Sequence, residues 1–179
     1  DEYSASGKTN MFGDVVKVVE MQSEAGAIGM VHGLLQNGVL ATTYTASQGL
    51  LLMIPNMYKI AGELLPCVIN VAARTVATHA LSIMGDHSDI YSTRPTGFAI
   101  FSSSSVQQVM DLTGVSYLSS IKGRIPFVNF FDGFRTSHEY NKINVIDNEI
   151  FKELLDYKAL ENFRKNSLDI DNPTTRGTN

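Results

Sequence analysis

The 179-residue sequence has few of the residues that disulfide-rich, cluster-binding or membrane proteins need. Cys67 is the only cysteine, so the chain forms no internal disulfide and cannot supply the four thiolates of an iron–sulfur cluster alone. The net charge of −4 gives no basic footprint for nucleic acid or an anionic membrane. The most apolar stretch, residues 50–65, is interrupted by Pro55, Lys59 and Glu63 and is too short to span a bilayer. These absences leave one packed domain as the expectation, because 44% of the residues are hydrophobic.

Short β-prone runs alternate with helical patterns along the chain. Strands are predicted over residues 15–19, 39–45, 67–72, 97–101 and 126–131, with a weaker candidate at 142–146, and helices over residues 23–36, 48–64, 75–84, 106–123 and 149–165. This alternation predicts an α/β fold, with a mostly parallel sheet and helices on both faces. We expect the domain to cover residues 1–166 and a polar tail or linker to cover residues 167–179. The chain does not begin with Met, so we expect it to start inside a longer polypeptide.

Two charged residues follow predicted strands, at the edge where parallel sheets carry their chemistry. Glu24 opens the helix after the first strand, beside the small residues Ala25 and Gly26, and Arg74 follows the third strand. Small side chains let a flat ring approach the backbone closely. Local sequence also fits a plainer interpretation, in which Ser23 caps the helix, Glu24 complements its dipole and Arg74 forms a surface ion pair.

Several longer stretches of the sequence resemble a known protein family, which the local patterns alone do not indicate. The chain contains EMQSEAG at residues 20–26, TYTASQGLLLMIPNMYKI at 43–60, GELLP at 62–66, GDHSD at 85–89 and FFDGFRTSHE at 130–139. Together they resemble the first domain of pyruvate:ferredoxin (flavodoxin) oxidoreductase, and the match extends over almost the whole chain. The resemblance implies the pyrimidine-binding type of thiamine diphosphate domain, with Glu24 as the partner of the aminopyrimidine N1′ and Arg74 as the group that binds the substrate carboxylate. A carboxyl that shares a proton with N1′, and a guanidinium fork that grips two oxygens, suit these roles.

The same resemblance implies a parent enzyme much larger than this chain. Such an enzyme oxidatively decarboxylates pyruvate with coenzyme A, giving acetyl-CoA and CO₂, and passes electrons through [4Fe-4S] clusters to ferredoxin or flavodoxin. Another domain would hold most of the thiamine diphosphate and its Mg²⁺, and the clusters would also lie elsewhere. We expect a homodimer in the cytoplasm, or in the matrix of an anaerobic mitochondrion-like organelle, and an isolated fragment that is inactive and binds thiamine diphosphate weakly.

Several alternatives stay open at this point. The same first domain occurs in fusions that reduce NADP and in relatives that act on other 2-oxo acids, and a non-catalytic scaffold is a further possibility. The family domain also starts earlier, with a Tyr-Pro-Ile-Thr-Pro-type loop that this sequence does not contain. Among other polar groups, residues 85–89 are expected to form a polar turn rather than a metal site, His32 and His79 to pack on helices, and Glu20 to be structural. The loop at residues 132–139 is expected to shape the site or a domain contact.

Overall fold

The computed structural model describes residues 2–80, 82–167 and 170–171. Seven α-helices, four strands and two short 3₁₀ turns are assigned in this part of the chain. In chain order they are α1 (Glu2–Ala5), α2 (Glu24–Gln36), β1 (Thr42–Thr45), α3 (Gln48–Gly62), β2 (Val68–Ala73), α4 (Ser88–Thr93), η1 (Arg94–Thr96), β3 (Ala99–Ser103), α5 (Val106–Gly123), β4 (Phe127–Asp132), η2 (Thr136–His138), α6 (Asn148–Leu154) and α7 (Tyr157–Lys165).

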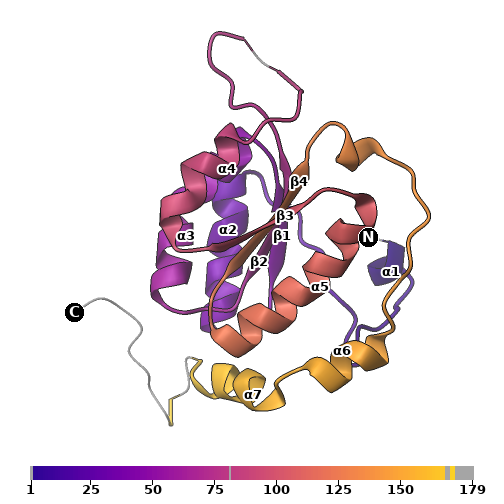
Figure 1. Cartoon of the computed structure of the whole chain (residues 1–179). Coiled ribbons are helices and arrows are strands. Elements are labelled where there is room, and N and C mark those ends of the chain that lie inside the picture. The colour runs from indigo at the N-terminus through magenta and orange to yellow at the C-terminus, as the bar shows by residue number, and fades with distance from the viewer. Residues whose placement is uncertain (1, 81, 168–169, 172–179) are drawn as a thin grey trace.

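The four strands form one sheet in the order β1-β2-β4-β3, and every neighbouring pair is parallel. Helices α2 and α3 pack together on one side of the sheet, with α4 against α3, and α5 lies on the other side, where α6 and α7 pack against it (Figure 1). The predicted α/β class, a parallel sheet with helices on both faces, is therefore confirmed. All four strands end at the same edge of the sheet, which is called the carboxyl edge here.

The two faces of the sheet are packed with different chemistry. The α2/α3 side is apolar, with Ile28, Leu35, Leu50, Met53 and Met57 completely buried. Burying such side chains is the main favourable term in folding.

The α5 side contains a buried polar network instead. Asn129 on β4 donates to Thr113 on α5 at 2.9 Å and accepts from the Ser103 hydroxyl at 2.8 Å. Asn70 stands opposite Asn129 in the β2–β4 register and accepts from the Thr113 hydroxyl at 3.0 Å. These bonds join three strands and one helix, so they fix the strand register as well as the position of α5.

Polar side chains and glycine mark the ends of the helices, and Ser23 is the cap that the sequence predicted. The Ser23 hydroxyl accepts the Gly26 N–H at 3.3 Å, and the Ser105 hydroxyl accepts the Gln108 N–H at 3.3 Å. Gly38 has φ +74° just after α2, as expected of a C-terminal glycine. Pro55 lies inside α3 without splitting it.

The predicted strand at residues 15–19 is wrong. That segment is extended and exposed, and its one ladder contact is an isolated antiparallel bridge between Val15 and Thr9. Val16, Val18 and Val19 are each about half exposed. Valine favours a strand where its side chain packs against neighbouring strands. Among the described residues these valines have no neighbouring strand to pack against, so their β propensity is not enough to form one.

Three predictions after residue 74 are also wrong. Residues 75–84, predicted as a helix, form a long loop as far as the structure describes them, and it projects from the carboxyl edge before α4 (Figure 1). Residues 142–146 are not a strand. The predicted helix at 149–165 is two helices, because Asp156 starts a second one by accepting the Ala159 N–H at 2.9 Å.

The helices and strands of the described residues end at Lys165, and most of the predicted tail at 167–179 lies outside those residues. The division between domain and tail stays a prediction. Within the described residues, every helix is too short or too polar to cross a lipid bilayer.

Candidate functional site

Glu24 lies at the carboxyl edge because α2 runs in the opposite direction to the strands and begins there. Its side chain lies directly over Gly49, in the first turn of α3. A Cβ atom placed on Gly49 would stand 2.8 Å from Glu24 Oε1 and 2.6 Å from Thr45 Oγ1. Both distances are shorter than real Cβ contacts, so a side chain at position 49 would force Glu24 and Thr45 to move from these positions. Gly49 therefore sets where the Glu24 carboxyl sits.

A groove of about 620 Å³ opens beside Glu24. One wall is formed by residues 16–19 and 21–24, the other by β1, and Ala27 and Met53 complete the lining. This volume is within the range of small-molecule sites, roughly 300–1,000 Å³. The lining is mixed: the valines, Met21 and Met53 give apolar surface, while Lys17, Gln22 and the threonines of β1 are polar, and Glu24 is its one carboxylate.

Thr45 has a buried hydroxyl that finds no hydrogen-bond partner in the described structure. Buried polar groups are nearly always paired, so an unpaired one needs an explanation. It lies at the end of β1 against the same glycine as Glu24. A carboxylate, an unpaired hydroxyl and a glycine therefore meet at one point of the carboxyl edge.

Arg74 follows β2, and its backbone N–H donates to Asp89 Oδ2 at 3.0 Å. Its side-chain stem lies against Gly133, where an added Cβ would be 2.5 Å from Arg74 Cγ. In the described part of the chain, no acidic side chain forms an ion pair with Arg74. The half-buried guanidinium thus has the capacity to bind an anionic ligand.

Asp89 joins the loops of this edge. It is completely buried, and its Oδ2 also accepts the Ser47 N–H at 3.0 Å, while Oδ1 accepts the Ile90 N–H at 2.7 Å. Ser47 has φ +50° and ψ −127°, a backbone conformation that costs energy for a residue with a side chain. Its hydroxyl lies 2.8 Å from the Thr75 carbonyl rather than capping α3.

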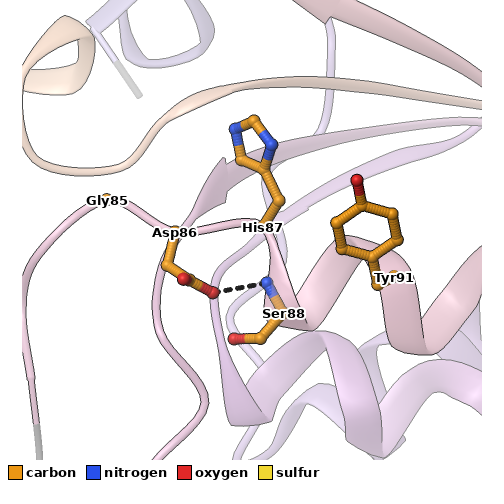
Figure 2. Close-up of a pocket in the computed structure, with 5 residues that line it drawn as sticks. All are labelled: Gly85, Asp86, His87, Ser88 and Tyr91. Carbon is orange, nitrogen blue, oxygen red and sulfur yellow. Dashed lines mark hydrogen bonds between the residues drawn. The ribbon is translucent and has the colours of Figure 1, made fainter.

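The GDHSD run borders a shallow second cavity of about 480 Å³, lined by Gly85, Asp86, His87, Ser88 and Tyr91. Figure 2 shows Asp86 accepting the Ser88 N–H while the His87 ring points away from both. Hydrogen bonds from Ser88 lower the pKa of the Asp86 carboxyl. The described residues contain no group of three or more His, Cys, Asp and Glu side chains that could hold a metal ion. Asp89, from the same run, is buried beneath the cavity residues.

A second acidic residue stands beside this run. Asp132, at the end of β4, accepts the backbone N–H groups of Arg135 and Phe134. Both bonds lower the pKa of its carboxyl, and the bond from Arg135 has the larger effect. A Cβ on Gly85 would overlap the Asp132 carboxyl, so the 85–89 and 132–139 loops meet at the carboxyl edge.

The predicted site residues therefore occupy the predicted edge of the sheet. In the described structure Glu24 and Arg74 are linked through residues 47–49 and Asp89, not by a direct contact. Glu24 is exposed in this chain. His32 packs between helices as predicted, with Nε2 2.6 Å from Glu63 Oε2, whereas His79 is exposed on a loop.

Sequence reasoning missed Gly49, Thr45 and Asp89. The two contacts at Gly49 depend on how α2 packs on α3, and the burial of Asp89 depends on how three loops meet. The strand-end rule that selected Arg74 also selects the loop at residues 45–49, but it singles out neither Thr45 nor Gly49.

A comparison with solved structures identifies the class of domain. The fold resembles 2-oxoglutarate:ferredoxin oxidoreductase from Magnetococcus marinus, with a TM-score of 0.58 and 20% identity over 68% of this chain and 22% of that one. At this identity the likeness shows the α/β fold alone.

Sequence comparison narrows the class to a family. All 179 residues match the family described as pyruvate flavodoxin/ferredoxin oxidoreductase, thiamine diP-bdg, and the chain belongs to that family. It is 64% identical to a pyruvate-flavodoxin oxidoreductase from Enterobacter agglomerans and 61% identical to a pyruvate:ferredoxin oxidoreductase from Moorella thermoacetica. Each match covers 99% of this chain and 15% of the relative. A pyruvate dehydrogenase [NADP(+)] from Cryptosporidium parvum is 56% identical over 99% of this chain and 9% of its own length.

Proposed function

We propose that this chain is the part of a thiamine diphosphate-dependent pyruvate oxidoreductase that contacts the cofactor's aminopyrimidine through Glu24 and the substrate carboxylate through Arg74. The proposal depends most on one observation: the Glu24 carboxyl lies over Gly49, and Glu24 lines the groove. That placement fixes a proton-sharing group where a flat ring can reach it.

Glu24 would hold a proton between its carboxyl and the pyrimidine N1′. Bound thiamine diphosphate supplies a nucleophilic carbon and takes up the electrons that decarboxylation releases. Glu24 is exposed in this chain, so another domain must cover it in the complete enzyme and exclude water. Excluding water strengthens the interaction between the carboxyl and N1′. The rest of the enzyme would also supply the diphosphate and Mg²⁺ site and the [4Fe-4S] clusters.

Arg74 would orient the 2-oxo acid. Its backbone is held by Asp89 and its stem by Gly133, which leaves the guanidinium fork to bind both oxygens of a carboxylate. One such charge-assisted contact is worth roughly 1.5–3 kcal/mol. This is enough to orient substrate, while the proton transfer at Glu24 has to account for more of the rate.

The complete reaction we propose converts pyruvate and coenzyme A to acetyl-CoA and CO₂, with electrons passing through the clusters to ferredoxin or flavodoxin. The remaining domains and a second copy of the complete chain are the proposed partners. A fusion that reduces NADP is the second candidate, because a relative of that name is 56% identical over 99% of this chain. Measuring pyruvate oxidation by the complete enzyme with ferredoxin, flavodoxin and NADP in turn separates the two.

Glu24→Gln in the complete enzyme tests the central role. Glutamine keeps the shape of the side chain but cannot share a proton, so pyruvate decarboxylation should fall by about 10²–10⁴-fold. Thiamine diphosphate content and cluster absorbance should stay at the wild-type level. Activity close to wild type would rule out the proton-sharing role of Glu24.

Glu20→Gln is the matched control. Glu20 lies four residues earlier on the same exposed segment and does not line the groove. It makes the same loss of charge at almost the same place, and its activity should equal that of the wild type.

A further inference from the structure

Asp89 is the one acidic or basic residue that is completely buried in the described part of the chain. A buried carboxylate is costly unless hydrogen bonds replace its water. Here the replacements are three backbone N–H groups: Ser47 and Arg74 on Oδ2, and Ile90 on Oδ1. One oxygen atom therefore ties the loop after β1 to the first residue after β2.

Both loops lead to a residue of the proposed site. Arg74 is one of the two directly bonded residues. Ser47 precedes α3 by one residue, and the first turn of α3 contains Gly49, on which the Glu24 side chain rests. A shift of the Ser47 backbone would move Gly49 and the Glu24 side chain that rests on it. A shift of the Arg74 backbone would move the guanidinium.

Ser47 also needs an external restraint. Its φ of +50° lies in the left-handed region, which a serine adopts only when the surroundings hold it there. The Asp89 bond to its N–H and the contact of its hydroxyl with the Thr75 carbonyl supply that hold.

We propose that Asp89 is a positioning residue that sets the distance between the Glu24 and Arg74 side chains. It touches neither the cofactor nor the substrate, and it acts through the backbone of Ser47 and Arg74. This inference rests on the roles proposed above for Glu24 and Arg74, and its test separates the two.

Two substitutions in the complete enzyme give a graded test. Asp89→Asn keeps an oxygen for Ser47 and Arg74 but turns an NH₂ group toward the Ile90 N–H. Asp89→Ala removes all three acceptors. A misplacement of about 1 Å in a site costs about 10²-fold, so kcat/KM should fall by about 10-fold in the asparagine variant and about 100-fold in the alanine variant. The asparagine variant also tests the proposal if the alanine variant fails to fold.

Two readouts distinguish positioning from simple destabilisation. Hydrogen exchange of the Ser47 and Arg74 amides should accelerate in the order wild type, Asn, Ala, and the KM for pyruvate should rise in the same order. Loss of folded enzyme alone lowers kcat and leaves KM unchanged. Asp86→Asn is the control, since Asp86 is exposed and accepts only from Ser88, and neither readout should move.

Accelerated exchange with a raised KM supports the proposal. Unchanged exchange of both amides, or accelerated exchange with an unchanged KM, overturns it. The Arg74→Lys variant judges the proposed function separately. If that variant raises the KM while the Asp89 variants do not, the role of Arg74 stands and the positioning role of Asp89 falls.

Discussion

The two ends of the sheet use the same helices in opposite ways. Helices α2 and α3 each run from the carboxyl edge to the amino edge. At the amino edge their polar groups bind one another: Glu63 Oε2 lies 2.6 Å from His32 Nε2 and also accepts from Gln36. At the carboxyl edge polar groups have spare capacity, since the Thr45 hydroxyl is unpaired and Arg74 has no acidic partner among the described residues.

This difference teaches where to look for function. Groups that satisfy each other stabilise the fold, whereas groups that the fold holds in place without a partner are available to a ligand. Substitutions at the carboxyl edge should therefore change activity more than stability. Substitutions at the amino edge should do the reverse.

Gly49→Ala should have the largest effect on this contrast. The new methyl would push on the Glu24 carboxyl and Thr45 Oγ1, so Glu24 must move. A displacement of that kind should lower kcat of the complete enzyme by about 100-fold. Gly62→Ala, at the other end of α3, places its methyl in open space and should leave kcat unchanged. Steady-state kinetics measure kcat for both variants. Equal kcat values in the two variants would contradict the account.

Arg74→Lys should have the next largest effect. Lysine keeps the charge but loses the fork that grips two oxygens, so the KM for pyruvate should rise by about 10-fold or more. Arg94→Lys, at an exposed position, serves as the matched control and should leave KM as it is. An unchanged KM in the Arg74 variant would remove Arg74 from the substrate site.

Glu63→Ala tests the amino edge. It leaves His32 and Gln36 without their shared acceptor, at a cost of about 1–3 kcal/mol for partly buried groups. Hydrogen exchange of the α2 and α3 amides in the complete enzyme measures this loss as a lower free energy of local opening. Activity at low temperature should match that of the wild type. Lys59→Gln, an exposed change on the same helix, should alter neither quantity.

Cys67 gives the smallest effect, and only at high pH. Burial raises the pKa of its thiol from 9.0 to about 12. The folded thiol stays neutral while the unfolded one ionises, so the contribution to stability is full below pH 9 and is lost as pH rises toward 12. The free energy of opening should fall there by at most about 1.4 kcal/mol per pH unit. Cys67→Ala should remove this slope; hydrogen exchange that gave both proteins the same slope would refute it.

Much of this fold follows from sequence, because local signals and tertiary packing agree. Ser23 and Ser105 cap helices as their positions predict, and the apolar pattern of α3 becomes its buried face. The failure at residues 15–19 arises because tertiary contacts, rather than local propensity, decide whether a strand forms. The valines at 15–19 suit a strand, but no strand pairs with them, so they remain exposed.

The candidate site divides in the same way. Arg74 could be predicted because it follows a predicted strand that the structure contains as β2. The strand predicted before Glu24 is absent, so the prediction of Glu24 rests on the run at residues 20–26, which resembles a known family. Asp89 could not be predicted, since its run has the composition of a polar turn and only the meeting of three loops buries it. The role of Gly49 could not be predicted either, because its contact with Glu24 arises only when α2 packs on α3.

The most direct test of the account is the rate at which the thiazolium C2 proton of bound thiamine diphosphate exchanges with deuterated water. This rate reports activation of the cofactor before any substrate binds. In the complete enzyme it should fall by about 10²–10⁴-fold in Glu24→Gln and stay at the wild-type value in Glu20→Gln. Wild-type exchange in a cofactor-loaded Glu24→Gln enzyme would contradict the claim that this carboxyl activates the cofactor.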